Sequence, residues 1–150
     1  MGTMRNETHG ANVDDCYPCE GGKYCDVLAA KGPTGICLAG YYCPSTDDIG
    51  DPRPSTHRCP TGFYCLDDTA DPIPCQPGTY QPSEQETTCL ECPAGHYCPQ
   101  NTTIPIDCPI YSFCPNGSAE PTLCLNGTYN DASTTLEKPE DCSACTAGRL

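Results

Sequence analysis

Cysteine is the residue type in this chain with the most evident chemistry. Sixteen of the 150 residues are cysteines, and thiols form disulfides, bind metal ions or carry out redox reactions. A zinc site needs two C-x-x-C pairs close in sequence, or one pair with two suitably spaced histidines, and a redox pair needs a βαβ unit. The chain has three such pairs, 73 and 53 residues apart, and three histidines: Cys16/Cys19, Cys89/Cys92 and Cys142/Cys145, with His9, His57 and His96. Structural disulfides are therefore the better interpretation.

Paired aspartates are the other residues that invite a chemical role. Asp14-Asp15, Asp47-Asp48 and Asp67-Asp68 offer the oxygen ligands that Ca²⁺ prefers. None lies in a calcium-binding loop with alternating acidic positions and a closing glutamate, so solvated loop charge is favoured. No Ser-His-Asp, Cys-His or paired-carboxylate set suggests catalysis. We predict a protein that is not an enzyme, with no metal site and no cofactor besides N-linked glycans.

The elements that position these cysteines must be built with very little apolar bulk. Leucine, isoleucine, valine and phenylalanine together number 18, tryptophan is absent, and proline and glycine together number 31. Burial of so little apolar surface cannot offset the entropy lost on folding, so disulfides have to hold the chain. This excludes a globular enzyme with a large core, a coiled coil and a parallel α/β fold.

Charge, cysteines and sequons together predict an extracellular address, secreted or on a cell-surface appendage. A formal charge of −13 repels phosphate backbones and anionic lipids, and no apolar run approaches the roughly 18 residues of a membrane span. An even number of cysteines in a small polar chain is typical of an exported, oxidised protein. Residues 1–13 do not resemble a signal peptide, which indicates a mature form or a segment of a longer chain. Four N-x-[ST] sequons are candidate N-glycosylation sites: Asn6, Asn101, Asn116 and Asn126.

One phrase, C-x-x-G-x-Y-C, recurs along the chain. It spans 19–25, 37–43, 59–65 and 92–98; a degenerate copy at 108–114 has lost the glycine, and front halves lie at 75–80 and 124–129. The glycine permits a turn with positive φ after the first cysteine, and the aromatic residue can lie over the sulfur bridge in place of a core. We expect this bridge-capping role for seven residues: Tyr24, Tyr42, Tyr64, Tyr97, Phe113, Tyr80 and Tyr129.

The repeat predicts a small disulfide-rich fold, an elongated string of short β-ribbon and turn modules with little regular secondary structure. We divide it into a first module (1–44), an inserted half-module with a linker (45–74), a second module (75–123) and a partial third module (124–150). Both ends are cut in mid-repeat, because Gly2-Thr3-Met4 matches the G-T-Y of a loop and Cys145-Thr-Ala-Gly148 matches the start of another phrase.

The combined pattern C-x-x-G-T-Y…C-x-x-C-P-x-G-x-Y-C resembles the ephrin-receptor-like cysteine-rich repeat of extracellular proteins, and is similar to the cysteine-rich domains of tumour-necrosis-factor receptors. The resemblance covers nearly the whole chain and is specific for fold rather than function. It implies six bridges: Cys75–Cys89, Cys124–Cys142, Cys92–Cys108, Cys98–Cys114, Cys19–Cys37 and Cys25–Cys43. Cys59 and Cys65 are an insertion relative to the pattern, and pairing them together is the default.

Cys16 and Cys145 are left over under this pairing. Three explanations stay open. The chain is a fragment of a longer repeat array, or Cys16 pairs with Cys145 of the next copy, or local pairing differs from that of the family.

Two functions fit these patterns. The first is a non-catalytic structural subunit of an extracellular glycosylated filament or surface appendage, assembled head to tail from copies of itself or from further repeats of the same chain. The alternative is a ligand-binding or adhesive cysteine-rich module of a receptor-like ectodomain. Neither involves nucleic acid or direct membrane insertion.

Overall fold

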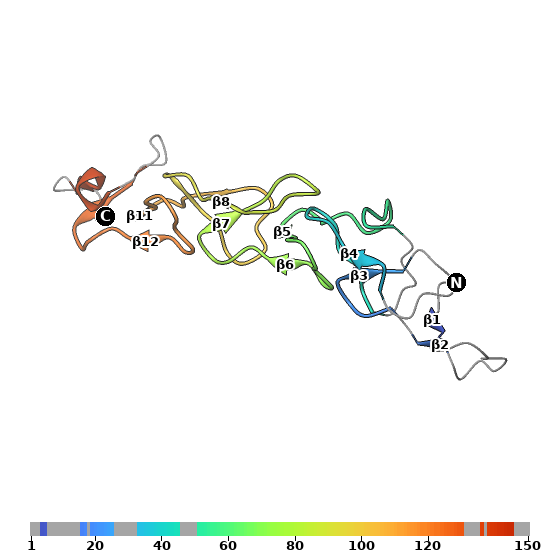
Figure 1. The fold of residues 1–150 in the computed structure, drawn as a ribbon. Coiled ribbons are helices and arrows are strands. Elements are labelled where there is room, and N and C mark those ends of the chain that lie inside the picture. Colours follow the sequence, from blue (N-terminus) through green and yellow to red (C-terminus); the bar gives the residue numbers. More distant parts are fainter. Residues whose placement is uncertain are drawn as a thin grey trace. The chain divides into compact units, whose positions relative to one another are not determined.

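The chain folds into short paired strands joined by turns. The computed structural model describes residues 4–5, 16–17, 19–25, 33–45, 51–130, 136 and 138–145 (Figure 1). Within these residues, strands of two residues each pair as two-stranded ribbons, and a 3-10 helix, η2 (Pro139–Asp141), precedes the last strand. The ribbons are β1 (Met4–Arg5) with β2 (Cys16–Tyr17), β3 (Lys23–Tyr24) with β4 (Gly35–Ile36), β5 (Phe63–Tyr64) with β6 (Ile73–Pro74), β7 (Thr79–Tyr80) with β8 (Leu90–Glu91), β9 (His96–Tyr97) with β10 (Ile106–Asp107), β11 (Ser112–Phe113) with β12 (Thr122–Leu123), and β13 (Thr128–Tyr129) with β14 (Ser143–Ala144). This is the small disulfide-rich fold with little regular secondary structure that the composition predicts.

From β3 onward, each ribbon belongs to one copy of the repeated phrase, which we call a module. A module begins at a cysteine, turns three residues later, forms its first strand at the aromatic residue, and forms its second strand just before the next module. In the second module, an antiparallel bridge between Tyr41 and Arg58 takes the place of the ribbon. The modules are 1 (19–36), 2 (37–58), 3 (59–74), 4 (75–91), 5 (92–107), 6 (108–123) and 7 (124–144). They are shorter than the four segments predicted from the sequence.

The turn that opens a module is dictated by its glycine. In module 1 the N–H of Lys23 donates to the carbonyl of Glu20 (3.1 Å), and Gly22 between them has a φ of 83°. A turn with positive φ at its third position favours glycine, which has no Cβ to clash with the backbone. The same turn bond recurs in modules 2 to 5 and 7, again with a glycine at positive φ. The positive-φ turn predicted from the sequence is therefore confirmed.

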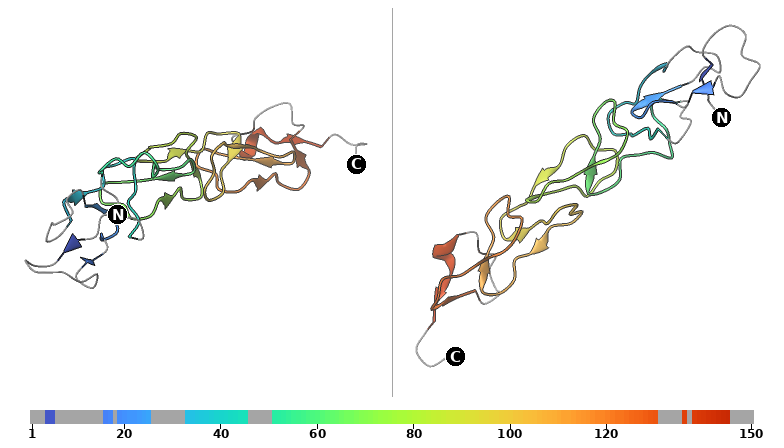
Figure 2. Two further views of the ribbon diagram at one scale, coloured as in Figure 1. Left: turned by 90° about the vertical axis from the view of Figure 1, so that its right-hand side faces the viewer. Right: turned by 90° about the horizontal axis from the view of Figure 1, so that it is seen from below.

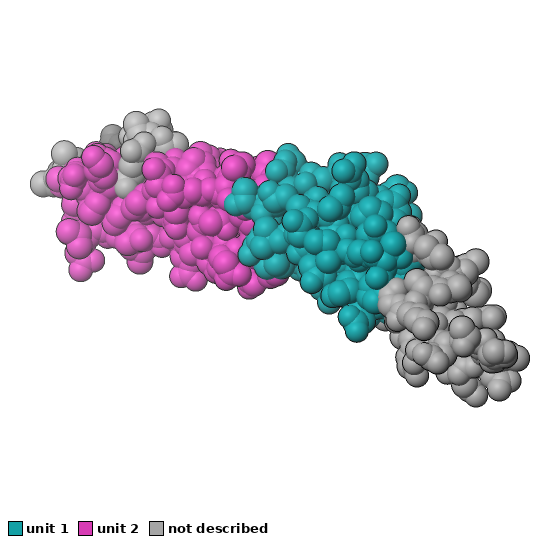
Figure 3. Space-filling model, in the orientation of Figure 1, with its two compact units in different colours: residues 1–73, 83–88 teal, residues 74–82, 89–150 magenta. Residues whose placement is uncertain are grey.

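The chain divides into two compact units (Figure 3), residues 1–73 with 83–88, and residues 74–82 with 89–150. Apart from Pro74, modules 1 to 3 lie in the first unit. Modules 5 to 7 lie in the second, with all of module 4 except its 83–88 segment. In each unit the strands alternate with turns and extended segments (Figure 2), so each unit has to be held by something other than a continuous sheet.

Half-cystines form the interior of both units. Apart from glycines and Pro54, the buried apolar residues of the described part are eleven cysteines and Leu136. Six of these cysteines are buried in the first unit and five in the second. Disulfides thus occupy the place that aliphatic side chains take in larger domains, as expected for a chain that has so few of them.

The disulfide pairing is mostly local. Five bridges close within one phrase, with a sequence separation of 6: Cys19–Cys25, Cys37–Cys43, Cys59–Cys65, Cys92–Cys98 and Cys108–Cys114. Two bridges close a longer hairpin, Cys75–Cys89 and Cys124–Cys142, with separations of 14 and 18. These two and Cys59–Cys65 are the pairs expected from the sequence.

The interleaved pairing implied by the family resemblance is wrong. The structure contains none of the four expected bridges, Cys92–Cys108, Cys98–Cys114, Cys19–Cys37 and Cys25–Cys43. The physical reason is the turn with positive φ, at a glycine or, in the degenerate copy, at Tyr111, which folds the chain back within one phrase. It brings the two Cα atoms of each short bridge to between 5.8 and 6.2 Å, which is within the range that a disulfide spans.

Candidate functional site

The most regular feature of the structure is a ladder of backbone hydrogen bonds between successive modules. The carbonyl of the turn residue in one module accepts the N–H of the first cysteine of the next module. The bond recurs six times at 2.7 to 2.9 Å: Cys37 to Gly22, Cys59 to Gly40, Cys92 to Gly78, Cys108 to Gly95, Cys124 to Tyr111 and Cys145 to Gly127. Because both groups belong to the backbone, the bond is independent of the side chains at either position.

A second hydrogen bond joins the same two modules, with the donor now in the earlier module and the acceptor in the later one. The N–H of the turn glycine donates to the carbonyl at the second cysteine of the next module: Gly22 to Cys43, Gly40 to Cys65, Gly78 to Cys98 and Gly95 to Cys114, at 2.7 to 2.9 Å. The turn glycine is therefore fastened through both its N–H and its carbonyl. These groups are buried with the turn, so leaving either one unpaired would be costly.

A short turn after the second cysteine, or in module 4 after Gln81 at the equivalent position, supplies a third bond. The residue at this turn is left-handed, and its N–H donates to the carbonyl of the first cysteine in the module before. The pairs are Asp68 to Cys37, Gln85 to Cys59, Asn101 to Cys75 and Gly117 to Cys92, at 2.8 to 3.2 Å, with φ between 62° and 72°. Three of the four non-glycine residues with positive φ in the described part belong to this set.

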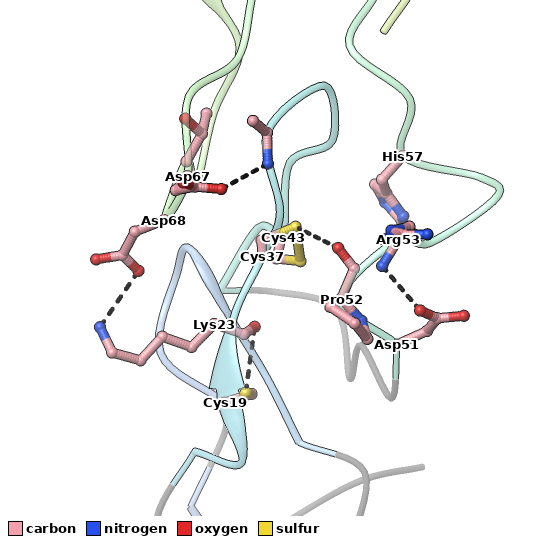
Figure 4. The surroundings of a disulfide bond; sticks show 12 residues. Cys19, Lys23, Cys37, Cys43, Asp51, Pro52, Arg53, His57, Asp67 and Asp68 are labelled. Carbon is pink, nitrogen blue, oxygen red and sulfur yellow. Dashed lines mark hydrogen bonds and ion pairs between the residues drawn. A yellow bond between two sulfur atoms is a disulfide. The ribbon is translucent and has the colours of Figure 1, made fainter. Parts of the chain in front are cut away.

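Side chains near the cysteines stabilise the same turns. The Oδ1 atoms of Asp67 and Asn116 accept the N–H groups of Ala39 and Ala94 in the module before, at 2.8 and 2.7 Å. Figure 4 shows Asp67 reaching this N–H beside the Cys37–Cys43 bridge, and Asp68 facing the Lys23 ammonium 3.4 Å away. The hydroxyls of three residues donate to the carbonyl three positions earlier: Thr69, Thr102 and Ser118.

The turn glycine also touches the module two places further along. A Cβ built on Gly22 would overlap the carbonyl oxygen of Asp68, and one built on Gly78 would overlap that of Gly117. A Cβ on Gly40 would collide in the same way with the carbonyl of Gln85. The missing side chain is therefore required twice, for the positive φ and for this approach. Within each unit, a module is held by the two modules that follow it.

The expected bridge-capping contact is seen at one disulfide. Tyr24 and Tyr41 are half-buried and pack against Cys37–Cys43, which for Tyr24 is the bridge of the next module rather than its own. Tyr24 lies over Gly35 on the paired strand, where a Cβ would meet the ring at 2.8 Å. Tyr42 contacts His57 edge-on, with ring centroids 5.1 Å apart. The other five rings are half-buried in first strands, and their capping role stays a prediction: Tyr64, Tyr80, Tyr97, Phe113 and Tyr129.

Three of the four sequons lie on the described surface. Asn101, Asn116 and Asn126 are exposed, whereas Asn6 lies outside the described residues. Asn116 uses its Oδ1 to accept the Ala94 N–H, which leaves its Nδ2, the atom that carries an N-glycan, free of that bond. Glycosylation at these positions is therefore compatible with the ladder.

The two leftover cysteines precede module 1 and follow module 7. Cys145 is exposed and is not in a disulfide, and its N–H makes the first ladder bond to Gly127. Cys16 lies in β2, and its side chain is outside the described part. In the part of the chain that the structure covers, no group of three or more His, Cys, Asp or Glu residues could hold a metal ion, and no helix is long and apolar enough to cross a membrane.

The left-handed turns after the second cysteines were missed at the level of sequence. Their signal is present in C-L-D-D-T (65–69), C-P-Q-N-T (98–102) and C-P-N-G-S (114–118). In these segments, Asp, Asn or Gly, the residues that best tolerate positive φ, stands three positions after the cysteine and Thr or Ser stands four after it.

Comparison with known proteins adds no family to this picture. The chain matches no model of a known protein family, and no curated protein is significantly similar to it in sequence. The seven disulfides among the described residues and the repeated modules are those of a disulfide-rich repeat protein, and so many bridges suggest an extracellular or secreted protein.

Proposed function

We propose that the chain is a non-catalytic structural subunit of an extracellular, glycosylated filament or surface appendage, built from copies joined head to tail. The observation that carries the proposal is the ladder, because within each unit one interface, repeated with little variation, fastens a module to the modules that follow it. An interface of this kind is open-ended. A further module can add in the same way, from the same chain or from another copy, and a contact that does not close on itself propagates into a fibre.

Charge and glycans support the same proposal. A net charge of −13 disfavours side-by-side association of copies, and glycans on the exposed Asn101 and Asn116 would add to that separation. We also propose that the chain is related to the ephrin-receptor-like cysteine-rich repeats and that it is located at the cell surface.

Electron microscopy of the native, unreduced material tests the proposal. We expect regular filaments whose axial repeat matches one chain, together with glycopeptides at Asn101 or Asn116 in mass spectra. Isolated short particles at every protein concentration would contradict the filament.

A ligand-binding or adhesive module is the second candidate. It is favoured by the large apolar side chains that the second unit leaves exposed, including Ile104 and Leu123, each more than 70% exposed. Substitutions there would then abolish binding of a soluble partner without changing the fold or the mass of the particle.

A further inference from the structure

In the second unit, the first cysteine and the turn residue of each module become more exposed to solvent from module 4 to module 7. The first cysteine is fully buried in modules 4 and 5, at Cys75 and Cys92, but partly exposed in modules 6 and 7, at Cys108 and Cys124. The turn residue follows the same course, because Gly78 and Gly95 are buried while Tyr111 and Gly127 are exposed. The ladder explains this trend, since a module is covered by the two modules that follow it. Among the described residues, modules 6 and 7 thus expose positions that are buried in modules 4 and 5.

This surface carries four large apolar side chains, which we call the module 6–7 ridge: Ile110, Tyr111, Leu123 and Leu125, exposed by 49, 57, 74 and 73%. The two chain segments that carry them run side by side, because the N–H of Cys124 donates to the carbonyl of Tyr111 (2.8 Å) and Ser112 pairs with Leu123 across the β11–β12 ribbon. Single exposed apolar residues are ordinary, whereas a contiguous group marks an interaction surface.

The ridge is also the least charged part of the chain. Residues 108–130 contain one charged residue, Glu120, although 18% of the whole chain is charged. Copies that repel each other through a net charge of −13 approach here at the lowest electrostatic cost. This surface is therefore better suited to bind a second copy of the chain than the more charged parts of the molecule are.

Tyr111 shows that the ridge is not an ordinary turn. It occupies the glycine position of the repeat with a φ of 67°, a conformation that bulky residues rarely adopt. At Gly78, the space that a Cβ would fill is taken by the carbonyl of Gly117, two modules along. Module 6 keeps the positive φ but places an aromatic side chain where modules 1, 2 and 4 leave room for a carbonyl.

We propose that the module 6–7 ridge docks a cysteine-rich module of a second copy of this chain, with the Tyr111 ring as part of the contact. The inference rests on the proposed head-to-tail assembly and names its surface, and it continues the interface that the modules already make with each other. The ridge joins copies through apolar side chains rather than through the backbone hydrogen bonds of the ladder.

The sequon at Asn126 adjoins the ridge, because Asn126 is exposed and follows Leu125 directly. A glycan on Asn126 would cover Leu125 and the exposed Gly127, so docking requires Asn126 to be unmodified in assembled copies. Glycopeptide mass spectrometry of assembled material is expected to find Asn126 unoccupied. Full occupancy in filaments would overturn the proposal.

Sedimentation equilibrium of the oxidised 150-residue chain tests the ridge, with Asn126→Gln in every variant to remove the sequon. The double variant Leu123→Thr/Leu125→Gln is expected to raise the dissociation constant for self-association about tenfold or more. The matched control Leu66→Gln/Leu90→Thr removes two other half-exposed leucines and is expected to leave it unchanged. Equal effects in the two variants, or no effect in the first, would overturn the proposal.

Tyr111→Gly separates docking from folding. Glycine relieves the left-handed conformation, so a residue with only a structural role would give a higher melting temperature and unchanged association. Docking through the ring predicts a higher melting temperature together with association weakened about tenfold, and unchanged or tighter association would overturn it.

The ridge and the filament fail in different ways. If filaments persist in the leucine double variant, the ridge proposal fails and the filament proposal stands. If the chain forms dimers that depend on the ridge but never lengthen, the filament proposal fails and the ridge proposal stands. A chain that stays monomeric at every concentration overturns both.

Discussion

Modules 4 and 7 have nearly the same local structure in different surroundings. Both begin C-x-x-G-T-Y, and both close through a long bridge, Cys75–Cys89 or Cys124–Cys142. Their glycines, Gly78 and Gly127, have the same φ of 86°. In both, the threonine hydroxyl donates to the carbonyl three residues earlier at 2.7 Å. Local sequence therefore fixes the turn in the same form at both places.

The neighbours of the two glycines differ completely. Gly78 is buried, and a Cβ there would overlap the carbonyl of Gly117, whereas a Cβ on Gly127 would meet nothing within 4 Å. The comparison shows that the same phrase contributes to stability in two ways. By itself it specifies a turn, and where later modules pack on it, it also forms part of an interface between modules.

Alanine at the two glycines should give the largest difference. Gly127→Ala is expected to lower the free energy of unfolding by about 1–2 kcal/mol, the usual cost of a left-handed alanine. Gly78→Ala bears the same cost and also displaces a backbone carbonyl, so we expect a loss of about 4 kcal/mol. Urea unfolding of the oxidised variants, followed by circular dichroism, measures both losses. Equal losses would show that the contact with Gly117 contributes nothing.

Removal of the long bridges should have the next largest effect. Replacing either pair by serine is expected to cost about 3 kcal/mol, because each bridge closes a loop of similar length in the unfolded chain. The Cys75–Cys89 pair should cost more than Cys124–Cys142, since Cys75 is 0% exposed whereas Cys142, the more buried member of the other pair, is 8% exposed, and a buried serine hydroxyl needs a partner. The same urea titration gives the two values, and the reverse order would contradict the role of burial.

A buried hydrogen bond in module 7 tests a smaller contribution to stability. It is made by the side-chain amide of the residue that stands where other modules have their second cysteine. In module 7 this position is Asn130, which is 4% exposed and donates from Nδ2 to the Ser112 carbonyl at 3.3 Å. Asn130→Ala is expected to cost about 1–2 kcal/mol, because it leaves a buried carbonyl without this donor. Asn126→Ala, on the exposed side of the same module, is the matched control and should change the unfolding midpoint very little.

The threonine turn bonds should show no difference between the two modules. Thr79→Val and Thr128→Val each remove one hydroxyl bond to a local carbonyl, which is worth about 1 kcal/mol. Because the bond lies within the turn, the two losses are expected to agree, in contrast to the two glycines. A clearly larger loss at Thr79 would mean that packing strengthens even this local bond.

The features that the sequence predicts correctly are those decided within a few residues. The scarcity of aliphatic residues predicted a cysteine interior, and Gly22 and its equivalents predicted turns with positive φ. The expectation of Cys19–Cys37 failed because the pairing depends on whether the turn closes within one phrase or reaches the next. The left-handed conformations of Asp68 and Gln85 were not predicted for a related reason. Each residue donates a backbone hydrogen bond to the first cysteine of the preceding module, which lies many residues earlier in the sequence.

The contacts two modules along could not be predicted from any one phrase. Gly78 shows no local sign that Gly117 will lie against it, and Leu125 shows none that its surroundings are open. Such contacts follow from how the modules stack, which the phrase alone does not encode.

Because the ladder is made from backbone N–H and carbonyl groups, its modules are interchangeable parts. A new module needs only its cysteines and a turn residue that adopts positive φ, whatever its other side chains are. Such a chain tolerates duplication, loss or shuffling of single modules without redesign of their joints. The side chains between the joints are then free to diverge, so two chains of this construction can share an architecture while retaining little common sequence.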